Sequence, residues 1–386
     1  MFEIKTMNKI SQQGLDVLAK NGFLVNPDSA NPEGLLIRSA KLHDETFGDK
    51  LLGIARAGVG YDNVPVERCT ENGIAVFNTA GANAEAVKEL TVCALLLASR
   101  DIAGGIEWVK GLVGQDGIAA AVEKGKSAFV GPELSGKTIG IVGLGAIGAL
   151  VANAAIALGM EVWGYDPYLS VEAAWRLRSD VNHASDLDTL FRMSDYITLH
   201  LACNNETRGM INAAAIAKMK PGTRIINLAR GELVDDDAML AALSAGKVAR
   251  YVTDFPNDKL AGAQGVVALP HLGASTPESE EKCAIMAAQE ISDYLLNGNT
   301  KNSVNLPNVY LDRAGKERLC VIHRNVPRML NRFLDLIGAQ NINVEHMINK
   351  ARGDVAYTVI DAGGALGGEI TGKIAAMEEV LRVRVI

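Results

Sequence analysis

Residues able to do chemistry recur at the ends of short apolar runs in this sequence. A glycine-rich segment, GLGAIG from Gly143 to Gly148, follows the apolar run KTIGIV. Further along the chain, Arg230, Asp254 and His271 each stand at or just beyond the end of such a run. Arginine can grip a carboxylate through two N–H groups, and histidine can take or give a proton near neutral pH. These residue types suit an acid–base reaction on an anionic substrate.

The glycine segment has the spacing that a dinucleotide requires. Gly143 allows a tight turn, Gly145 lets the backbone approach a pyrophosphate, and Gly148 permits close helix–strand packing. The helix that follows offers free N–H groups to the anion. Asp166 lies eighteen residues beyond Gly148, at the end of the next apolar run. A carboxylate there accepts hydrogen bonds from ribose hydroxyls and repels a 2′-phosphate. Alone the glycine spacing is a weak signal, but in this context it predicts NAD and not NADP.

Hydride transfer needs a cation for a carboxylate, an acid–base group and a residue that tunes that group. Arg230 suits the first role and His271 the second, and Asp254 or Asp258 could hydrogen-bond the imidazole. Taken singly, Arg230 could be a surface ion-pair partner and Asp258 a solvated turn residue. Their convergence at the carboxyl ends of parallel strands favours the catalytic interpretation. His200, inside the apolar run ITLHLA, is interpreted as a core histidine.

A parallel sheet is needed to bring these residues together. From about residue 138, six apolar runs alternate with helical stretches, which is typical of a Rossmann-type doubly wound α/β sheet. The first hundred residues show a weaker alternation and predict a second, flavodoxin-like α/β substrate domain. Residues 317–386 have the order βαββαβ of a ferredoxin-like unit, with its second helix expected at about 370–381.

The expected domain boundaries follow from these patterns. Residues 1–82 plus 275–303 form the substrate-binding domain, and 83–274 form the NAD-binding domain. A polar linker covers 304–316 and the C-terminal domain covers 317–386. Apolar helices at 85–100 and about 277–297 are expected to carry the chain between the first two domains.

Composition excludes several classes of protein. The 386 residues carry a formal net charge of −7 with no basic run, which argues against a nucleic-acid partner. No run of about 18 or more apolar residues occurs, so a membrane span is excluded. The first residues, MFEIKTMNKIS, lack the apolar core of a secretory signal, so we expect a cytoplasmic protein. Five scattered cysteines with no CxxC pair predict neither a disulfide framework nor a metal site.

The motifs GLGAIG, YDP, NLARGELVD and LPHLGAST, in this order, resemble those of the D-2-hydroxyacid dehydrogenases over residues 1–303. The resemblance implies that Arg230 binds the substrate carboxylate and carbonyl, that His271 is the acid–base and that Asp254 contacts the nicotinamide amide. It places the carboxylate partner of the histidine at Asp258, in a segment one residue shorter than the family's and with Asp in place of Glu. We expect cofactor contacts from residues at the glycine loop and the strand ends: Gly143, Gly145, Ala146, Ile147, Gly148, Asp166, Leu201, Leu228, Ala229, Asp254, Gly273 and Ala274.

The segments LLIRSA and IARAGVGYDN resemble the branch of the family that oxidises 3-phospho-D-glycerate to 3-phosphohydroxypyruvate, the first step of L-serine biosynthesis. The resemblance implies that Arg38, Ser39 and Arg56 bind the phosphate and carboxylate end of the substrate. Two arginines at the ends of adjacent strands suit a dianionic phosphate. The segment GKSAFVG departs from the family, where an aromatic and several basic residues are expected. Two alternatives stay open: an unphosphorylated substrate such as hydroxypyruvate or glyoxylate, and a non-catalytic NAD(H)-sensing scaffold.

The last 70 residues resemble the ACT regulatory domains that follow many of these enzymes. The resemblance implies L-serine as a regulator, bound at a dimer interface by His323, Asn325 and Asn343. The chain has Arg328 where the family has a glycine. The expected partners are therefore the small-molecule substrate, a regulator and further copies of the chain in a homodimer or homotetramer, with no nucleic acid, membrane or metal ion.

Overall fold

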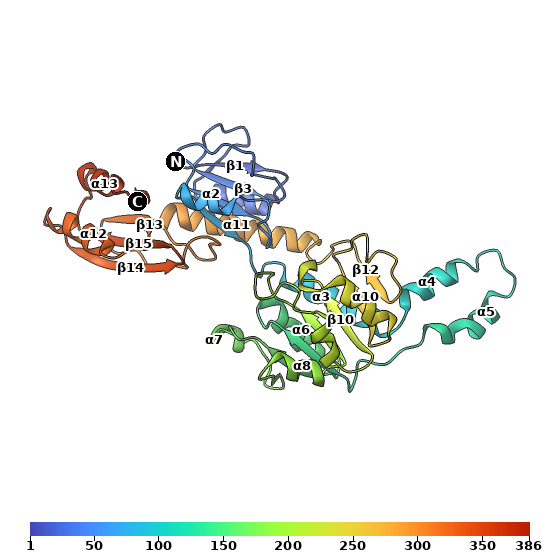
Figure 1. Cartoon of the computed structure of the whole chain (residues 1–386). Helices are drawn as coiled ribbons and strands as arrows, with labels where there is room; N and C mark the ends of the chain where they lie inside the picture. Colours follow the sequence, from blue (N-terminus) through green and yellow to red (C-terminus); the bar gives the residue numbers. More distant parts are fainter. The chain divides into compact units, whose positions relative to one another are not determined.

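Two units, Met1–Asn83 with Pro277–Ile386 (unit 1) and Ala84–Thr276 (unit 2), make up the fold, which Figure 1 shows as a computed structural model. The structure describes the whole chain apart from the side chain of Glu172. No helix in this described part is both long enough and apolar enough to cross a membrane.

Unit 2 is built on a seven-stranded parallel sheet with the order β12-β11-β10-β9-β6-β7-β8. Its central strands are almost wholly buried, because helices cover both faces, and this explains their continuous apolar runs. The order reverses between β6 and β9, where doubly wound sheets bind their ligands. The strands are β6 (Thr138–Val142), β7 (Glu161–Tyr165), β8 (Asn182–His183), β9 (Tyr196–Leu199), β10 (Thr223–Asn227), β11 (Val248–Thr253) and β12 (Val266–Ala268).

The helices of unit 2 include one of the two predicted connecting helices, α3, which runs from Ala84 to Ser99. The others are α4 (Ile102–Lys110), α5 (Ile118–Gly125), η1 (Lys126–Phe129), α6 (Ala146–Ala157), α7 (Val171–Ala174), α8 (Leu187–Met193), α9 (Ala213–Lys218), η2 (Gly231–Leu233) and α10 (Asp236–Ser244). The six predicted strands are confirmed. The two-residue strand β8 was not predicted, because Asn-His is polar and too short to form a run.

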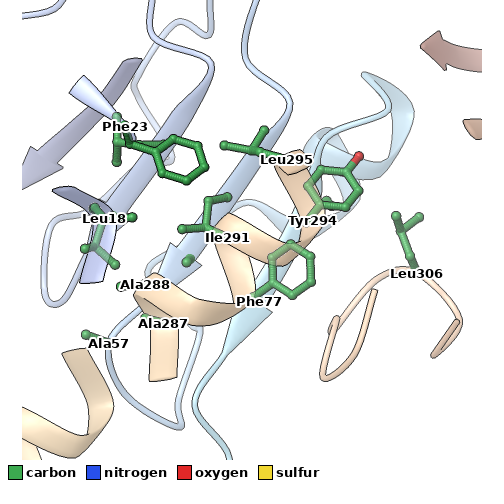
Figure 2. Close-up of a cluster of buried hydrophobic side chains, with 14 of the residues drawn as sticks. Leu18, Phe23, Ala57, Phe77, Ala287, Ala288, Ile291, Tyr294, Leu295 and Leu306 are labelled. Atoms are coloured by element: carbon green, nitrogen blue, oxygen red, sulfur yellow. The ribbon is translucent and has the colours of Figure 1, made fainter. Parts of the chain in front are cut away.

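Unit 1 begins with a five-stranded parallel sheet of order β2-β1-β3-β4-β5, which is the flavodoxin-like topology predicted. Helix α11 packs on this sheet, and Figure 2 shows its residues Ala287, Ala288 and Ile291 among the buried apolar side chains. Gly14 of α1 lies against α11 so closely that a Cβ would come within 2.8 Å of the Ala284 backbone. The elements are β1 (Glu3–Met7), α1 (Gln12–Lys20), β2 (Leu24–Val25), β3 (Gly34–Ile37), β4 (Gly53–Arg56), α2 (Val66–Glu71), β5 (Ala75–Asn78) and α11 (Pro277–Asn297).

The remainder of unit 1 is a four-stranded antiparallel sheet of order β14-β15-β13-β16, the predicted ferredoxin-like arrangement. The prediction of a helix to residue 381 was wrong. That helix ends at Ala375, because Val380 already pairs with His323 as the start of the last strand. The elements are β13 (Glu317–Arg324), α12 (Met329–Gly338), β14 (Val344–Arg352), β15 (Val355–Ala362), α13 (Gly368–Ala375) and β16 (Val380–Val385).

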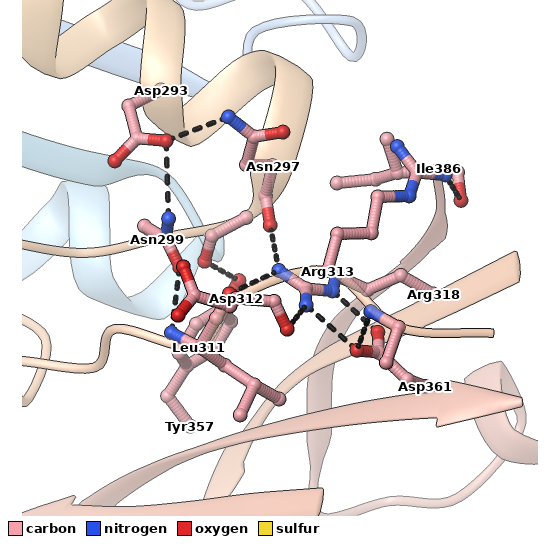
Figure 3. A network of polar contacts seen from close by, with 12 residues as sticks. Asp293, Asn297, Asn299, Leu311, Asp312, Arg313, Arg318, Tyr357, Asp361 and Ile386 are labelled. Atoms are coloured by element: carbon pink, nitrogen blue, oxygen red, sulfur yellow. Dashed lines mark hydrogen bonds and ion pairs between the residues drawn. The ribbon is translucent and has the colours of Figure 1, made fainter. Parts of the chain in front are cut away.

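A buried ion pair fixes this sheet to the end of α11 (Figure 3). The guanidinium of Arg318 bonds both oxygens of Asp361, at 2.6 and 2.8 Å, and both side chains are completely buried. The same guanidinium donates to the carbonyls of Asn297, Leu311 and Asp312. The segment between α11 and β13, predicted as a polar linker, is therefore held by specific bonds from the sheet that follows it.

Candidate functional site

The glycine loop joins β6 to α6 at the point where the strand order reverses. Gly143 has a φ of +90°, and a Cβ there would collide with the carbonyl oxygen of His200, so only glycine fits. A Cβ on Gly148 would collide with the carbonyl of Gly143. Gly145 is the N-cap of α6 and faces open space, because a Cβ there would meet no atom within 4 Å. The space in front of the helix N-terminus is therefore free for an anionic group.

Asp166 is tied directly to this loop from the end of β7. One carboxylate oxygen accepts the N–H of Leu144 at 2.9 Å, and the other accepts the N–H of Tyr168 at 2.9 Å. The bond to Leu144 holds the carboxylate beside the loop that would carry the pyrophosphate. Carboxylate oxygens can accept further bonds from ribose hydroxyls.

Asp254, His271 and Arg230 come together at the carboxyl ends of β10 and β11. The N–H of His271 donates to the carbonyl of Asp254 at 3.1 Å. Burial raises the pKa of the Asp254 carboxyl, while a bond from the N–H of Gly273 and the charges of His271 and Arg230 act in the opposite direction. His271 and Arg230 thus both lie within electrostatic reach of Asp254.

The two carboxylate oxygens of Asp254 differ in their hydrogen bonding. Oδ2 accepts the N–H of Gly273 at 3.2 Å, whereas Oδ1 is buried and has no hydrogen-bond partner in the described part of the chain. A buried acceptor without a partner is costly, so it marks a place for a donor from a ligand. An amide N–H₂ such as that of nicotinamide fits this acceptor.

His271 is held in an unusual conformation. Its φ is +39°, a left-handed value that a non-glycine residue seldom adopts. The ring lies 4.8 Å, centroid to centroid, from the ring of Phe255. The imidazole is nevertheless exposed, so it is accessible to a substrate. Strained conformations of this kind cluster at functional sites, where the surrounding bonds maintain them.

Asp258 is placed differently from the other candidates. It is exposed in the loop between β11 and β12, and within the described residues its carboxylate makes no hydrogen bond or ion pair. The carbonyl of Asp254, by contrast, accepts the N–H of His271 at 3.1 Å. Of the two carboxylates predicted to tune the histidine, the geometry therefore favours Asp254.

Two polar residues that position site residues were not predicted. Asn227, the last residue of β10, donates to the carbonyl of Arg230 at 2.8 Å and accepts from the N–H of Ala229 at 3.2 Å. In unit 1, Asn63 accepts from Nε of Arg56 at 3.0 Å and donates to the carbonyl of Arg38 at 3.3 Å. In the sequence, the signal that could have identified Asn227 and Asn63 is a short polar residue close to each arginine.

The two arginines of unit 1 leave neighbouring strands. Arg56 ends β4 opposite Ile37, the last residue of β3, and Arg38 follows directly. The N–H groups of Ser39 and Ala40 donate to the side chain of Asn8, at 3.0 and 2.7 Å, which fixes the backbone after Arg38. The guanidinium of Arg38 bonds Glu280 of α11 at 2.7 Å. The predicted anion-binding residues thus lie together at the carboxyl ends of the neighbouring strands β3 and β4.

The other predicted cofactor residues lie around the same strand ends of unit 2. Each belongs to the glycine loop and the first turn of α6, or follows β9, β10 or β12: Ala146, Ile147, Leu201, Leu228, Ala229, Gly273 and Ala274. His200 follows β9, and burial lowers its pKa to about 3. It is therefore neutral and bonds Thr198 at 3.0 Å, which agrees with its interpretation as a structural histidine.

The three predicted regulatory residues make contacts within the protein. His323 is buried, and its ring nitrogens lie 2.8 Å from the carbonyl of Arg324 and 2.8 Å from the hydroxyl of Thr358. Asn325 donates to the carbonyl of Gly353, and Asn343 donates to Glu345. Arg328 has a φ of +70° at the start of α12, the backbone conformation that the expected glycine would adopt without strain.

Comparison with known proteins gives consistent matches over both units. The family model described as "D-isomer specific 2-hydroxyacid dehydrogenase, NAD binding domain" matches residues 93–273. A D-3-phosphoglycerate dehydrogenase of Bacillus subtilis is 34% identical over 334 residues, which are 82% of this chain and 61% of that protein. A hydroxypyruvate reductase of Thermotoga maritima is 39% identical over 256 residues, which are 63% of this chain and 78% of that protein.

Among solved structures, the NAD⁺-bound 3-phosphoglycerate dehydrogenase of Entamoeba histolytica matches with a TM-score of 0.62 and 27% identity. The match covers 80% of this chain and 99% of that one. The chain spans about 61% of the length of the Bacillus subtilis relative and 58% of a Synechocystis D-3-phosphoglycerate dehydrogenase to which it is 35% identical.

Proposed function

The chain belongs to the D-isomer specific 2-hydroxyacid dehydrogenases, as its motifs predicted, and from that premise we propose that it oxidises 3-phospho-D-glycerate to 3-phosphohydroxypyruvate with NAD⁺. Unit 2 contains the family's NAD-binding domain. The observation that carries the proposal is the pair of arginines, Arg38 and Arg56, at the ends of adjacent strands and joined through Asn63. Two guanidinium groups suit a phosphate dianion, whereas an unphosphorylated acid would not need both.

The residues of each unit have separate tasks in this reaction. The glycine loop, Asp166 and Asp254 would hold NAD⁺, which would supply the acceptor for the hydride at C2 of the substrate. Arg230 holds the substrate carboxylate, and His271 takes the proton of the hydroxyl group. Asp254 lies next to that histidine, whose N–H bonds its carbonyl, and offers its free side-chain oxygen to the carboxamide of the cofactor. Arg38, Ser39 and Arg56 bind the phosphate end.

The predicted domain boundaries are part of the proposal. Residues 1–82 with 275–303 are the substrate-binding domain, 83–274 the NAD-binding domain and 317–386 a regulatory domain joined through 304–316. The expected cytoplasmic location also stays a prediction, which fractionation of the source cells tests.

A substrate panel separates this proposal from its nearest alternative. The protein is assayed with NADH and 3-phosphohydroxypyruvate, hydroxypyruvate or glyoxylate, and kcat/KM is compared. The proposal requires the phosphorylated acid to be preferred. A preference for hydroxypyruvate would instead favour the activity named for the Thermotoga maritima relative. Binding of NADH without turnover of any acid would favour the non-catalytic sensor.

We also propose that the protein is a homodimer or a homotetramer. Helices α4 and α5 contain no buried residue, and Figure 1 shows them reaching away from the sheet of unit 2. The large apolar residues exposed in this segment are Ile102, Ile106, Val109, Val113, Ile118 and Val130. An apolar arm of this kind suits burial against a second copy. Light scattering after size-exclusion chromatography tests this, and a monomer at micromolar concentration would refute it.

We further propose that L-serine regulates the protein. The ferredoxin-like sheet and the residues His323, Asn325 and Asn343 agree with the ACT resemblance. Against it, both ring nitrogens of His323 already bond within the protein, and burial lowers the pKa of this histidine. Serine binding by His323 thus requires that at least one of these two hydrogen bonds breaks. Sub-millimolar L-serine that changes neither turnover nor melting temperature would refute regulation.

A further inference from the structure

The guanidinium of Arg38 is bound by an acidic residue far away in the sequence. Nη2 of Arg38 bonds Oε1 of Glu280 at 2.7 Å, across 242 positions of the chain. Glu280 lies in the first turn of α11, and its bond to Arg38 places it next to the carboxyl end of β3. A carboxylate therefore stands where the proposed function requires an anionic substrate group.

We propose that Glu280 is a specificity-determining residue that competes with the substrate's phosphate for Arg38. This inference rests on the proposed function, in which Arg38 binds the phosphate. A phosphate and a carboxylate have the same requirement for guanidinium N–H groups. The substrate must therefore either displace Glu280 or share Arg38 with a negative neighbour.

The surroundings of the pair allow such an exchange. The side chains of Arg38 and Glu280 are 41% and 45% exposed, and exposed ion pairs contribute little to stability. The backbone beside Arg38 is fixed by Asn8 and Asn63, so only the side chain needs to move. Glu280 also keeps a favourable position after it is displaced, because a negative charge in the first turn of a helix is stabilised by the helix dipole.

The consequence is selectivity between anions. Like charges repel, so Glu280 weakens the binding of a dianionic phosphate and has little effect on an uncharged hydroxymethyl group at the same position. The residue therefore reduces the advantage of phosphorylated over unphosphorylated 2-hydroxy acids. It is a specificity residue and takes no part in the transfer of hydride or proton.

The test compares Glu280→Gln with a matched control, Glu278→Gln. Both variants remove one carboxylate from the first turn of α11, but the carboxylate that bonds Arg38 is that of Glu280. Steady-state KM and kcat are measured with 3-phospho-D-glycerate and with D-glycerate. From the strength of exposed pairs, Glu280→Gln is expected to lower KM for the phosphorylated acid about two- to five-fold with kcat unchanged. KM for D-glycerate and both constants of Glu278→Gln should stay at the wild-type values.

Inorganic phosphate serves as a second probe that does not depend on turnover. Its dissociation constant, measured by calorimetry, is expected to fall in Glu280→Gln and not in Glu278→Gln. An unchanged or weaker affinity for phosphate in Glu280→Gln overturns the inference, even if 3-phospho-D-glycerate is a good substrate. Tighter phosphate binding without any turnover of 3-phospho-D-glycerate leaves the inference intact and refutes the proposed function.

Discussion

Replacing Glu290 with glutamine is expected to stabilise unit 1 at neutral and alkaline pH. Glu290 lies on the buried side of α11 and is 9% exposed. Oε1 accepts from Asn302 at 2.7 Å, and Oε2 is buried without a hydrogen-bond partner among the described residues. Burial raises the pKa of this carboxyl from 4.5 to about 8, although the bond from Asn302 and the charge of Lys301 act against it.

The size of the effect follows from that pKa. Between the ordinary pKa and the raised one, the unfolded chain is ionised at this position while the folded protein keeps the proton. The contribution of Glu290 to stability is therefore fully present below pH 4.5 and is lost as the pH rises towards about 8. Each pKa unit corresponds to about 1.36 kcal/mol, and the folded carboxyl is half ionised at its raised pKa, so the loss is on the order of 3 kcal/mol at pH 7 and about 4 kcal/mol at pH 8. Glutamine resembles the protonated carboxyl in shape and has no charge to lose.

Urea denaturation at about pH 5 and about pH 8 measures this difference, with Glu278→Gln as the control from the exposed first turn of the same helix. The wild type and Glu278→Gln should lose stability between the two pH values, and Glu290→Gln should lose about 3 kcal/mol less. Parallel stability curves for all three proteins would refute the reasoning, as would a Glu290→Gln variant that is less stable than the wild type at the higher pH.

Three further predictions concern the reaction and the fold. His271→Ala should lower kcat at least about 100-fold, because general acid–base catalysis contributes that much, while NADH binding persists; His183→Ala, an exposed histidine of the same unit, is the kinetic control, and near-normal turnover of the first variant would refute the assignment. Arg230→Ala should raise KM and lower kcat together in steady-state assays, since its contact with the substrate carboxylate persists in the transition state; a change in KM alone would contradict a role in that state. Arg318→Leu should lower the free energy of unfolding, measured with urea, by about 3–5 kcal/mol, because it leaves the carboxylate of Asp361 buried without its cation. The double variant Arg318→Leu with Asp361→Leu should recover much of this loss. Equal stability of the single variant and the wild type would argue against this view of the pair.

The parallel sheets could be predicted from the sequence because both of their faces are buried. Their strands are continuous apolar runs, and the polar residues that follow them mark the carboxyl ends, where a doubly wound sheet binds ligands. Gly143, Asp166, Arg230 and His271 were predicted as site residues in this way, and in the structure each of them lies after a strand of the unit 2 sheet. Helix α11 was predicted within a residue of its observed bounds, because its apolar pattern ends at a short polar segment.

Other features depend on contacts that the local sequence does not contain. Asp254 and Asp258 lie four positions apart, and only the fold decides that the first is buried beside His271 and the second exposed. The contact between Arg38 and Glu280 exists because α11 returns the chain to the first sheet. The end of α13 was predicted too late, because the pairing of β16 with β13 takes residues that helix propensity alone would leave in the helix.

The reduction of 3-phosphohydroxypyruvate by NADH, followed through the absorbance of NADH, tests the central claim most directly. The account predicts rapid loss of NADH with this acid, a smaller kcat/KM with hydroxypyruvate and glyoxylate, and a larger KM for 3-phosphohydroxypyruvate in an Arg38→Ala variant. Equal or faster loss of NADH with the unphosphorylated acids, or no loss with any of them, would contradict it.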